Sequence, residues 1–210
     1  MLSAVTPLPA ASVLVLRDAP LEVLLLRRSA ASSFMPNAWV FPGGIAEPAD
    51  DAGSELATMR VTAARETFEE SGIWLGAPLR DAAEKRRRLL AGELAFRDLL
   101  EEAPVDWESL VWTARWITPV GVPKRFDTYF FLAAVSRDVI ASAEQSELVD
   151  AKWLGPADAL AGDLQIMFPT RKNLEAIAGF DSARELIDSR RGATIEAIEP
   201  VLVNGKPTLR

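Results

Sequence analysis

The N-terminal part of the chain carries two apolar runs separated by a short polar break. Residues 12–17 (SVLVLR) and 22–28 (EVLLLRR) flank the segment DAP, whose Asp and Pro are typical of a turn. The pattern therefore predicts two β-strands. Residues 39–44 (WVFPGG) predict a short third strand that runs directly into a Pro-Gly-Gly turn.

The spacing of apolar residues changes between residues 55 and 73. Val61, Ala64 and Phe68 recur at intervals of three and four residues, which predicts a helix with one apolar face toward the core. Gly72 is placed to end this helix, because glycine readily adopts the left-handed backbone conformation that follows a helix C-terminus.

The rest of the chain alternates between helical segments and apolar strands. Residues 79–103 predict a helical insertion, and residues 156–190 predict a helical C-terminal segment. The expected strands lie at 110–118, 125–135, 148–154 and within 193–203, and the helices of the C-terminal segment at 156–161, 169–178 and 181–189. Strands in both halves with helices between them predict an α/β fold with a mixed sheet, and the length fits one domain over residues 1–210.

Composition removes several kinds of chemistry. The chain has no cysteine and no histidine, so acid–base or metal chemistry must rest on carboxylates, lysine or the single Tyr129. The formal charge of −7 argues against nucleic acid as a partner. The N-terminus lacks the charged region of a signal peptide, and no apolar run reaches the length of a membrane span. We therefore expect a cytoplasmic protein without a membrane partner.

The helix predicted at 55–73 ends in a dense group of charges, RETFEESGI. Arg65 and Glu69 stand one above the other on this helix, and Glu66 and Glu70 do the same. One arginine cannot neutralise three glutamates, and clustered hard oxygen ligands suit Mg²⁺ or Mn²⁺. A solvated helix face would use the same residue types, but the Pro-Gly-Gly turn upstream and the strands on either side favour a metal site.

These two segments together resemble a known motif. FPGG at 41–44, followed by RETFEESGI at 65–73, resembles the nudix box, written G-x5-E-x7-RE-U-x-EE-x-G-U with U apolar. The matching positions are Gly44, Arg65, Glu66, Glu69, Glu70, Gly72 and Ile73, with Thr67 at the first U. Twenty residues separate Gly44 from Arg65, where the motif has thirteen, and Ala57 stands where the motif has glutamate. The carboxylates that could replace that glutamate are Glu47, Asp50, Asp51 and Glu55.

Resemblance to the nudix family implies an α/β/α sandwich in which a catalytic loop–helix–loop binds divalent metal and cleaves a diphosphate linked to another group. The implied ligands of Mg²⁺ or Mn²⁺ are Glu66, Glu69, Glu70 and the backbone carbonyl of Gly44. The same resemblance implies that Arg65 orients Glu69. The general base would be a helix glutamate or an acidic residue of the polar segment before residue 148, which holds Glu144 and Glu147.

Two further stretches indicate the substrate. Residues 24–44 (LLLRRSAASSFMPNAWVFPGG) resemble the coenzyme A signature of some nudix enzymes, except that Ser33 stands where the signature has Arg and Asn37 where it has Gly. Together with RFDTYFFL at 125–132, they resemble the nudix subgroup that includes peroxisomal coenzyme A diphosphatases. This resemblance implies hydrolysis of coenzyme A or acyl-CoA to 3′,5′-ADP and (acyl-)phosphopantetheine, although the chain ends in PTLR without that organelle's C-terminal address.

Candidate substrate contacts follow from the chemistry of coenzyme A. Arg28 and Arg125 are candidates for its phosphates, because arginine suits bidentate contacts. Phe34, Trp39 and Phe126 are candidates for stacking on its base, although buried aromatic residues are more often part of a core. The basic run KRRR at 85–88 is interpreted as a solvated helix face.

Other interpretations stay open at this point. The same metal helix would serve a nudix hydrolase for ADP-ribose, NADH or a nucleotide sugar. A nudix-like module that binds a nucleotide without cutting it would typically lose one of the helix glutamates, and all three are present. An acyl chain would need an apolar channel, which Trp112, Trp116 and Met167 could line if they are not part of the core. The apolar second half would permit a homodimer.

Overall fold

The centre of the molecule is a mixed β-sheet. The computed structural model describes residues 5–32 and 35–209. Eight strands form the sheet in the order β3-β2-β1-β6-β5-β8, with β4 also paired to β1 and β7 to β2. Their bounds are β1 (Leu8–Arg17), β2 (Glu22–Arg28), β3 (Trp39–Val40), β4 (Gly43–Ile45), β5 (Val111–Ile117), β6 (Phe126–Ala134), β7 (Leu148–Leu154) and β8 (Ala197–Ile198). The pairs β1–β6 and β5–β8 are parallel and the other pairs are antiparallel, which confirms the predicted mixed sheet.

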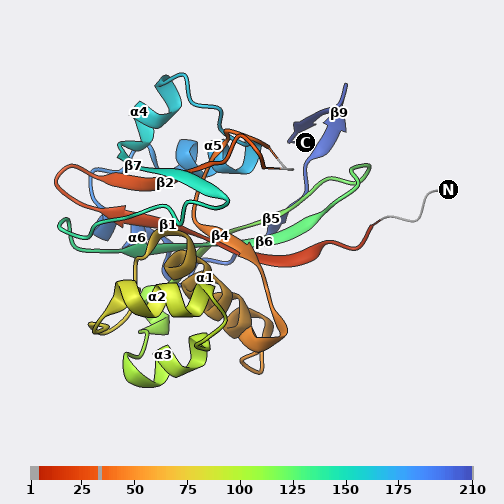
Figure 1. The fold of residues 1–210 in the computed structure, drawn as a ribbon. Coiled ribbons are helices and arrows are strands. Elements are labelled where there is room, and N and C mark those ends of the chain that lie inside the picture. Colours follow the sequence, from red (N-terminus) through yellow and green to blue (C-terminus); the bar gives the residue numbers. More distant parts are fainter. Residues whose placement is uncertain (1–4, 33–34, 210) are drawn as a thin grey trace.

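Helices cover both faces of this sheet (Figure 1). One face carries α1 (Glu55–Ser71), α2 (Ala82–Leu90) and α3 (Phe96–Glu102), and the other carries α4 (Pro156–Ala161), α5 (Phe168–Ile177) and α6 (Ala183–Arg190). Two short 3-10 helices lie at Pro48–Asp50 and Trp107–Ser109, and β9 (Val201–Val203) pairs with β10 (Lys206–Thr208) in a separate hairpin. The arrangement is an α/β/α sandwich, as predicted.

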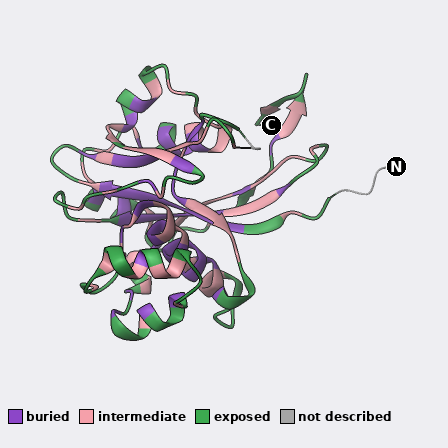
Figure 2. Cartoon of the chain, viewed as in Figure 1, coloured by how far each residue is buried: buried purple, intermediate pink, exposed green. Residues whose placement is uncertain are grey.

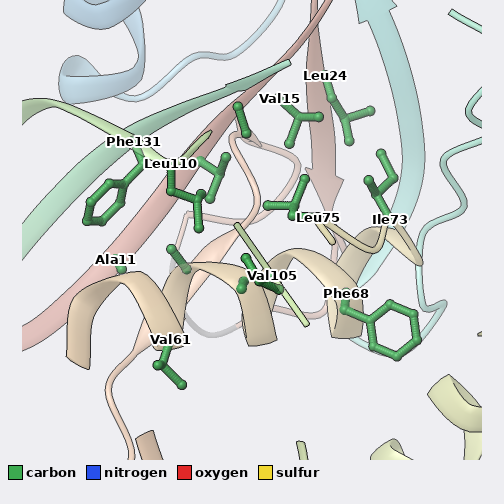
Figure 3. Packing of buried hydrophobic residues seen from close by; sticks show 14 of the residues in the cluster. Ala11, Val15, Leu24, Val61, Phe68, Ile73, Leu75, Val105, Leu110 and Phe131 are labelled. Atoms are coloured by element: carbon green, nitrogen blue, oxygen red, sulfur yellow. The ribbon is translucent and has the colours of Figure 1, made fainter. Parts of the chain in front are cut away.

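An apolar core lies between the sheet and each layer of helices. Alternate side chains of β1 point into one core or the other. Ala11, Val13 and Val15 belong to the cluster under α1, whereas Leu14 and Leu16 belong to the cluster under α5 and α6. Burial is accordingly concentrated in the sheet and on the helix faces that cover it (Figure 2). The predicted stripe Val61, Ala64 and Phe68 is buried in the first cluster, whose packing around α1 is drawn in Figure 3.

Most predicted elements are present, and two of the predicted segments each contain two elements. The segment 79–103 contains the two helices α2 and α3, because Gly92, which follows the α2 C-cap Ala91, adopts the left-handed conformation at φ 70°. The strand predicted within 193–203 is divided into β8 and β9. Among the described residues, the structure contains no helix with the length and apolar character that crossing a membrane requires.

For Trp112 and Trp116, the structure favours the core alternative over an apolar channel. Trp112 packs against the cluster under α1 and stacks on Tyr129, whereas Trp116 is buried in the opposite cluster against Phe168. Four residues apart on a regular strand, the two rings would share one face, but a register shift between Trp112 and Ala114 turns the strand over. Both tryptophans are therefore core residues of different layers.

Candidate active site

The carboxylate-bearing helix α1 begins and ends at specific caps. The Oγ of Ser54 accepts a hydrogen bond from the N–H of Ala57 at 3.3 Å, which satisfies a donor of the first turn. At the other end Gly72 adopts φ 73°, and its N–H donates to the carbonyl of Phe68. The helix therefore ends where the sequence predicted, and its three clustered glutamates lie in its last two turns.

Arg65 is the hub of this cluster, and it is buried. Its guanidinium donates to both carboxylate oxygens of Asp50, at 2.9 and 3.0 Å, and to the carbonyl of Ile45 at 3.0 Å. The Nη1 of the same group lies 3.0 Å from Glu66 Oε1 and 3.0 Å from Glu69 Oε2. The predicted i, i+4 contact between Arg65 and Glu69 is thus present, in a wider network.

Asp50 supplies the carboxylate that the motif places eight residues before the arginine. It ends the short 3-10 helix Pro48–Asp50 and is 1% exposed. Its Oδ2 also accepts hydrogen bonds from the Oγ1 of Thr62 at 2.9 Å and from the N–H of Glu47 at 3.0 Å. Of the four candidate carboxylates, Asp50 is the one that pairs with Arg65 through two hydrogen bonds, so the longer loop brings an acid to the same arginine by another route.

The Pro-Gly-Gly turn lies directly against the glutamates. The N–H of Gly43 donates to Glu70 Oε2 at 2.8 Å. A side-chain carbon added at Gly44 would overlap the carboxylate of Glu66, so the Gly44 backbone packs on that group. Strand β4 therefore brings both glycines to the edge of α1 where Glu66 and Glu70 project, as the motif implied.

The two glycines should respond differently to replacement by alanine. A Cβ at Gly43 would overlap the backbone of Ala11 and Ser12, whereas a Cβ at Gly44 would meet only the flexible end of Glu66. We expect Gly43→Ala to lower the free energy of unfolding by about 1–3 kcal/mol, the usual effect of overpacking, and Gly44→Ala to lower it by less than about 1 kcal/mol. Gly44→Ala should instead weaken Mn²⁺ binding by roughly 10-fold, because it would displace the carboxylate of Glu66, which is predicted to bind the metal.

Urea unfolding and Mn²⁺ titration check both changes, with Gly179→Ala as a control because a Cβ there contacts nothing within 4 Å. Equal destabilisation by the Gly43 and Gly44 replacements would contradict this assignment.

Burial makes the three glutamates reluctant to ionise. It raises the pKa of Glu66 to about 7, against the opposing effect of Arg65 and with a further contribution from the charge of Glu69. Burial also raises the pKa of Glu69, and it raises the pKa of Glu70 well above the ordinary value, where the charge of Glu66 adds to the shift. Without a cation the helix therefore carries more negative charge than Arg65 can stabilise.

This pKa pattern predicts how stability depends on pH. Because the folded pKa values lie above the unfolded value of 4.5, protonated glutamates stabilise the fold fully below that value, and the stabilisation is lost as pH rises through about 7. We expect the melting temperature of the metal-free protein to fall between about pH 5 and about pH 8. Mg²⁺ should raise it more at the higher pH, because protons no longer compete for the carboxylates. Thermal unfolding with Mg²⁺ or with EDTA checks this, and an equal effect of Mg²⁺ at both pH values would contradict it.

The carboxylates of Glu66, Glu69 and Glu70 and the carbonyl of Gly44 suit a divalent cation, but these oxygens do not point toward one common position. Three carboxylates and a backbone carbonyl are hard oxygen ligands of the kind that Mg²⁺ and Mn²⁺ prefer. Within residues 5–32 and 35–209, no three acidic side chains approach one another as a formed metal site requires. Glu66 and Glu69 face Arg65 and Glu70 faces Gly43, so binding a cation would require these side chains to rotate.

A second acidic segment lies beside the end of α1. The carboxylate of Glu144 accepts hydrogen bonds from the N–H groups of Glu147 and Leu148, so it is used to shape the segment. The carboxylate of Glu147 is 76% exposed and lies 3.8 Å from Arg28 Nη2. The positive charge of Arg28 lowers the pKa of Glu70 and the negative charge of Glu147 raises it, both less than burial does.

Comparison with known proteins identifies the family. A family model that describes the NUDT19 nudix domain matches residues 51–165, more than half of the chain. The chain belongs to the nudix hydrolase family. Nudix hydrolases generally need divalent metal ions and act on small-molecule diphosphates, and the helix α1 with the turn at Gly43 and Gly44 is the nudix loop–helix–loop.

Curated relatives and solved structures agree with this assignment. The chain is 30% identical to the acyl-coenzyme A diphosphatase NUDT19 of Xenopus laevis over 66% of its own length and 54% of that protein. It is 28% identical to the protein of that name from Gallus gallus, over 85% of its own length and 66% of that protein. A nudix hydrolase from Alicyclobacillus acidocaldarius superposes with a TM-score of 0.78 at 28% identity, covering 87% of this chain and 96% of that one. The chain spans about half of the length of the first curated relatives it matches.

The nudix fold places two of the predicted substrate contacts in structural roles. Arg125 is 6% exposed, and its guanidinium donates to the carbonyls of Thr118 and Val5 and to the carboxylate of Glu199. Trp39 is 5% exposed and belongs to the core cluster under α5 and α6. Because both side chains are enclosed by the protein's own groups, the structure favours a structural role over the substrate contacts predicted for them.

The other predicted contacts lie in more open positions or outside the described residues. Arg28 donates to the Oγ of Ser32 and lies beside Glu147, at the end of α1 that carries Glu70. Phe126 is partly exposed, with Lys124 Nζ 5.1 Å from its ring centre, and its role in stacking stays a prediction. Phe34 lies outside the described residues, as does Ser33.

Proposed function

We propose that the protein hydrolyses the diphosphate of coenzyme A or an acyl-CoA in a divalent-metal-dependent reaction, to 3′,5′-ADP and (acyl-)phosphopantetheine. The observation that carries the proposal is the contact of the FPGG turn with Glu66 and Glu70, two of the three glutamates of the nudix motif on α1. The matches to proteins named acyl-coenzyme A diphosphatase support the choice of substrate.

The proposed reaction requires residues that hold the metal and residues that position these ligands. Glu66, Glu69 and Glu70, with the Gly44 carbonyl, would hold the metal, which supplies charge stabilisation for the diphosphate and a more acidic bound water. Arg65 keeps the carboxylates of Glu66 and Glu69 at the edge of α1, and Asp50 keeps Arg65 charged and fixed. In the hydrolysis, the oxygen of water bonds to one phosphorus, the bridging P–O bond breaks, and the departing phosphate carries away the electron pair.

A carboxylate must take the proton of that water. We assign this role to Glu147 in preference to Glu144, because the carboxylate of Glu144 already accepts two backbone N–H groups of its own segment. Glu147 is exposed and lies beside Arg28, whose guanidinium suits a phosphate oxygen at the same end of α1. This assignment predicts that Glu147→Gln lowers kcat more than Glu144→Gln does.

One departure from the coenzyme A signature is conformationally conservative. Asn37 stands where the signature has Gly, and its φ of 61° lies in the left-handed region. Asparagine is among the non-glycine residues that adopt this conformation most readily. The backbone at Asn37 therefore has a conformation that glycine would also adopt readily, which makes the replacement compatible with the coenzyme A interpretation.

A hydrolysis screen tests the proposal. Coenzyme A, acetyl-CoA, ADP-ribose, NADH and a nucleotide sugar are incubated with the protein and Mg²⁺ or Mn²⁺, and products are separated by chromatography. Release of 3′,5′-ADP from coenzyme A or acetyl-CoA, faster than cleavage of the others, is the expected result. Faster cleavage of another diphosphate would overturn the substrate while keeping the nudix chemistry, and cleavage of none would favour a nucleotide-binding module.

A further inference from the structure

Three of the four residues of the basic run KRRR lie on the solvated helix face expected of them, and one does not. Lys85 pairs with Glu102, Arg87 with Glu84, and Arg88 with Glu93, all at the surface of α2 and its surroundings. Arg86 is different, because it is the one buried residue of α2 and is only 9% exposed. An arginine buried in a helix of the insertion needs partners to compensate for its lost hydration.

Arg86 finds its partners at the C-terminal end of the nudix helix. Its Nε donates to the backbone carbonyl of Glu69 at 2.9 Å, which belongs to the last turn of α1 and lacks a partner within the helix. A positive charge at a helix C-terminus is also favourable for the helix dipole. The absence of a side chain at Gly72 makes room for this contact, because a Cβ there would lie 3.1 Å from Arg86 Nη1.

The same guanidinium reaches the acidic segment 142–148. Its Nη1 donates to the Oγ of Ser142 at 3.0 Å, and the N–H of Ser142 donates to the carbonyl of Ser71 at 2.9 Å. Ser142 is therefore attached twice to the end of α1, once through Arg86 and once through the backbone. From there the segment continues to Glu144, whose carboxylate accepts the N–H groups of Glu147 and Leu148.

The Nη2 nitrogen of Arg86 differs from the Nε and Nη1 nitrogens in its hydrogen bonding. Its Nη2 is buried and makes no hydrogen bond to any described residue. Burial lowers the pKa of Arg86, and the negative charges of Glu144 and Glu70 oppose that effect, so both carboxylates lie near the guanidinium. Arg86 thus stands between the glutamate helix and the segment that carries the two other candidate carboxylates.

We propose that Arg86 is a positioning residue, which holds the segment 142–148, with its Glu147, against the C-terminal end of α1. The proposal rests on the proposed function, since it assigns Arg86 a role in the same diphosphate site. The proposal also assigns a function to the helical insertion, because Arg86 lies on its first helix, α2. Arg86 binds the backbone carbonyl of Glu69 and not its carboxylate, which pairs with Arg65, so Arg86 acts on geometry and is not itself a ligand of metal or substrate.

Measurements of kcat, KM and Mn²⁺ affinity in Arg86 variants test the proposal. We expect Arg86→Met to lower kcat by roughly 10- to 100-fold, because a misplacement of about 1 Å in a catalytic group has an effect of this size. KM and Mn²⁺ affinity should each change by less than about 3-fold, since no ligand carboxylate is removed. Arg86→Lys should not restore kcat, because one ammonium group cannot bond both Glu69 and Ser142 in the planar geometry of the guanidinium.

Two comparisons separate positioning from a loss of folding. Arg87→Met is the matched control: it removes an exposed neighbour on the same helix that pairs only with Glu84, and it should leave kcat unchanged. If Arg86→Met does not fold, Ser142→Ala removes the same link from the other side, and it should lower kcat in the same direction. Where both fold, the double variant should be little worse than Arg86→Met alone, because the two side chains act through one contact.

Hydrogen exchange gives a readout that does not depend on activity. In Arg86→Met the amides of residues 142–148 should lose protection, while those of residues 61–68 in α1 keep it. Unchanged protection of 142–148, or a kcat within about 2-fold of wild type in a folded Arg86→Met or Ser142→Ala variant, would overturn the proposal. If wild type cleaves no diphosphate, the proposed function fails separately, and the exchange comparison still decides whether Arg86 holds the segment.

Discussion

Replacing Glu70 with glutamine is expected to lower the rate of diphosphate hydrolysis by about 10³-fold, the largest catalytic loss of any single change at this site. Glu70 lies at the point where α1, the Gly43 turn and the neighbourhood of Arg28 and Glu147 meet. An amide keeps the size of the side chain but cannot supply a negative oxygen to a cation. Stabilisation of charge by a bound metal is worth several kcal/mol, and each tenfold in rate corresponds to about 1.4 kcal/mol.

Steady-state kinetics over a range of Mg²⁺ concentrations measures this effect. Glu84→Gln is the matched control, because Glu84 is an exposed glutamate of α2 that pairs with Arg87. The Glu70 variant should be at least as stable as wild type at neutral pH, since it removes a buried charge whose pKa is raised. A Glu70→Gln enzyme within about 10-fold of wild type at saturating Mg²⁺ would show that Glu70 is not a metal ligand.

Replacing Asp50 with asparagine is expected to have the largest effect on stability. The pair of Asp50 and Arg65 is buried on both sides, with side chains 2% and 6% exposed. Removing one partner of a buried ion pair typically costs about 3–5 kcal/mol, because the remaining charge loses its compensation. Since Glu66 and Glu69 also contact Arg65, we expect a loss of about 3 kcal/mol, at the lower end of that range.

Urea unfolding at neutral pH measures the loss. Asp51→Asn is the control, because Asp51 is exposed and its carboxylate accepts a local hydrogen bond from the N–H of Gly53, and the replacement should change stability by less than about 1 kcal/mol. The Asp50 variant should also bind Mn²⁺ more weakly, since Arg65 is then free to pair more closely with the ligand glutamates. Equal effects of the two replacements would mean that Asp50 does not anchor Arg65.

The sequence was sufficient for the elements whose signals are local. The helix α1 has a regular apolar stripe and a glycine at its end, and the strands at 22–28 and 148–154 are apolar runs bounded by polar residues, so short-range patterns locate all three. The contact of Arg65 with Glu69 follows from helix geometry alone. These features need no knowledge of distant parts of the chain.

The features that depend on distant contacts could not be predicted. Arg125 resembles an exposed cation at the start of a strand, but Val5 and Glu199, which lie 120 and 74 residues away in the sequence, enclose it. Arg86 belongs to a run of four basic residues, and only the docking of α2 on the end of α1 selects it for burial. The choice of Asp50 among four acids likewise required the path of the loop.

Because Asp50 contacts Arg65 directly, the length of the loop between Asp50 and α1 has little influence on the arrangement of the glutamates. The pair of Asp50 and Arg65 closes the loop that begins at Gly44, so the chain between Asp50 and the start of α1 at Glu55 adds no contact to the glutamates. Residues 51–54 are all exposed, and a Cβ at Gly53 would contact nothing. The chain at Gly53 is therefore a place where a fluorescent label or a short peptide could be inserted, provided that Ser54 stays next to α1 as its N-cap.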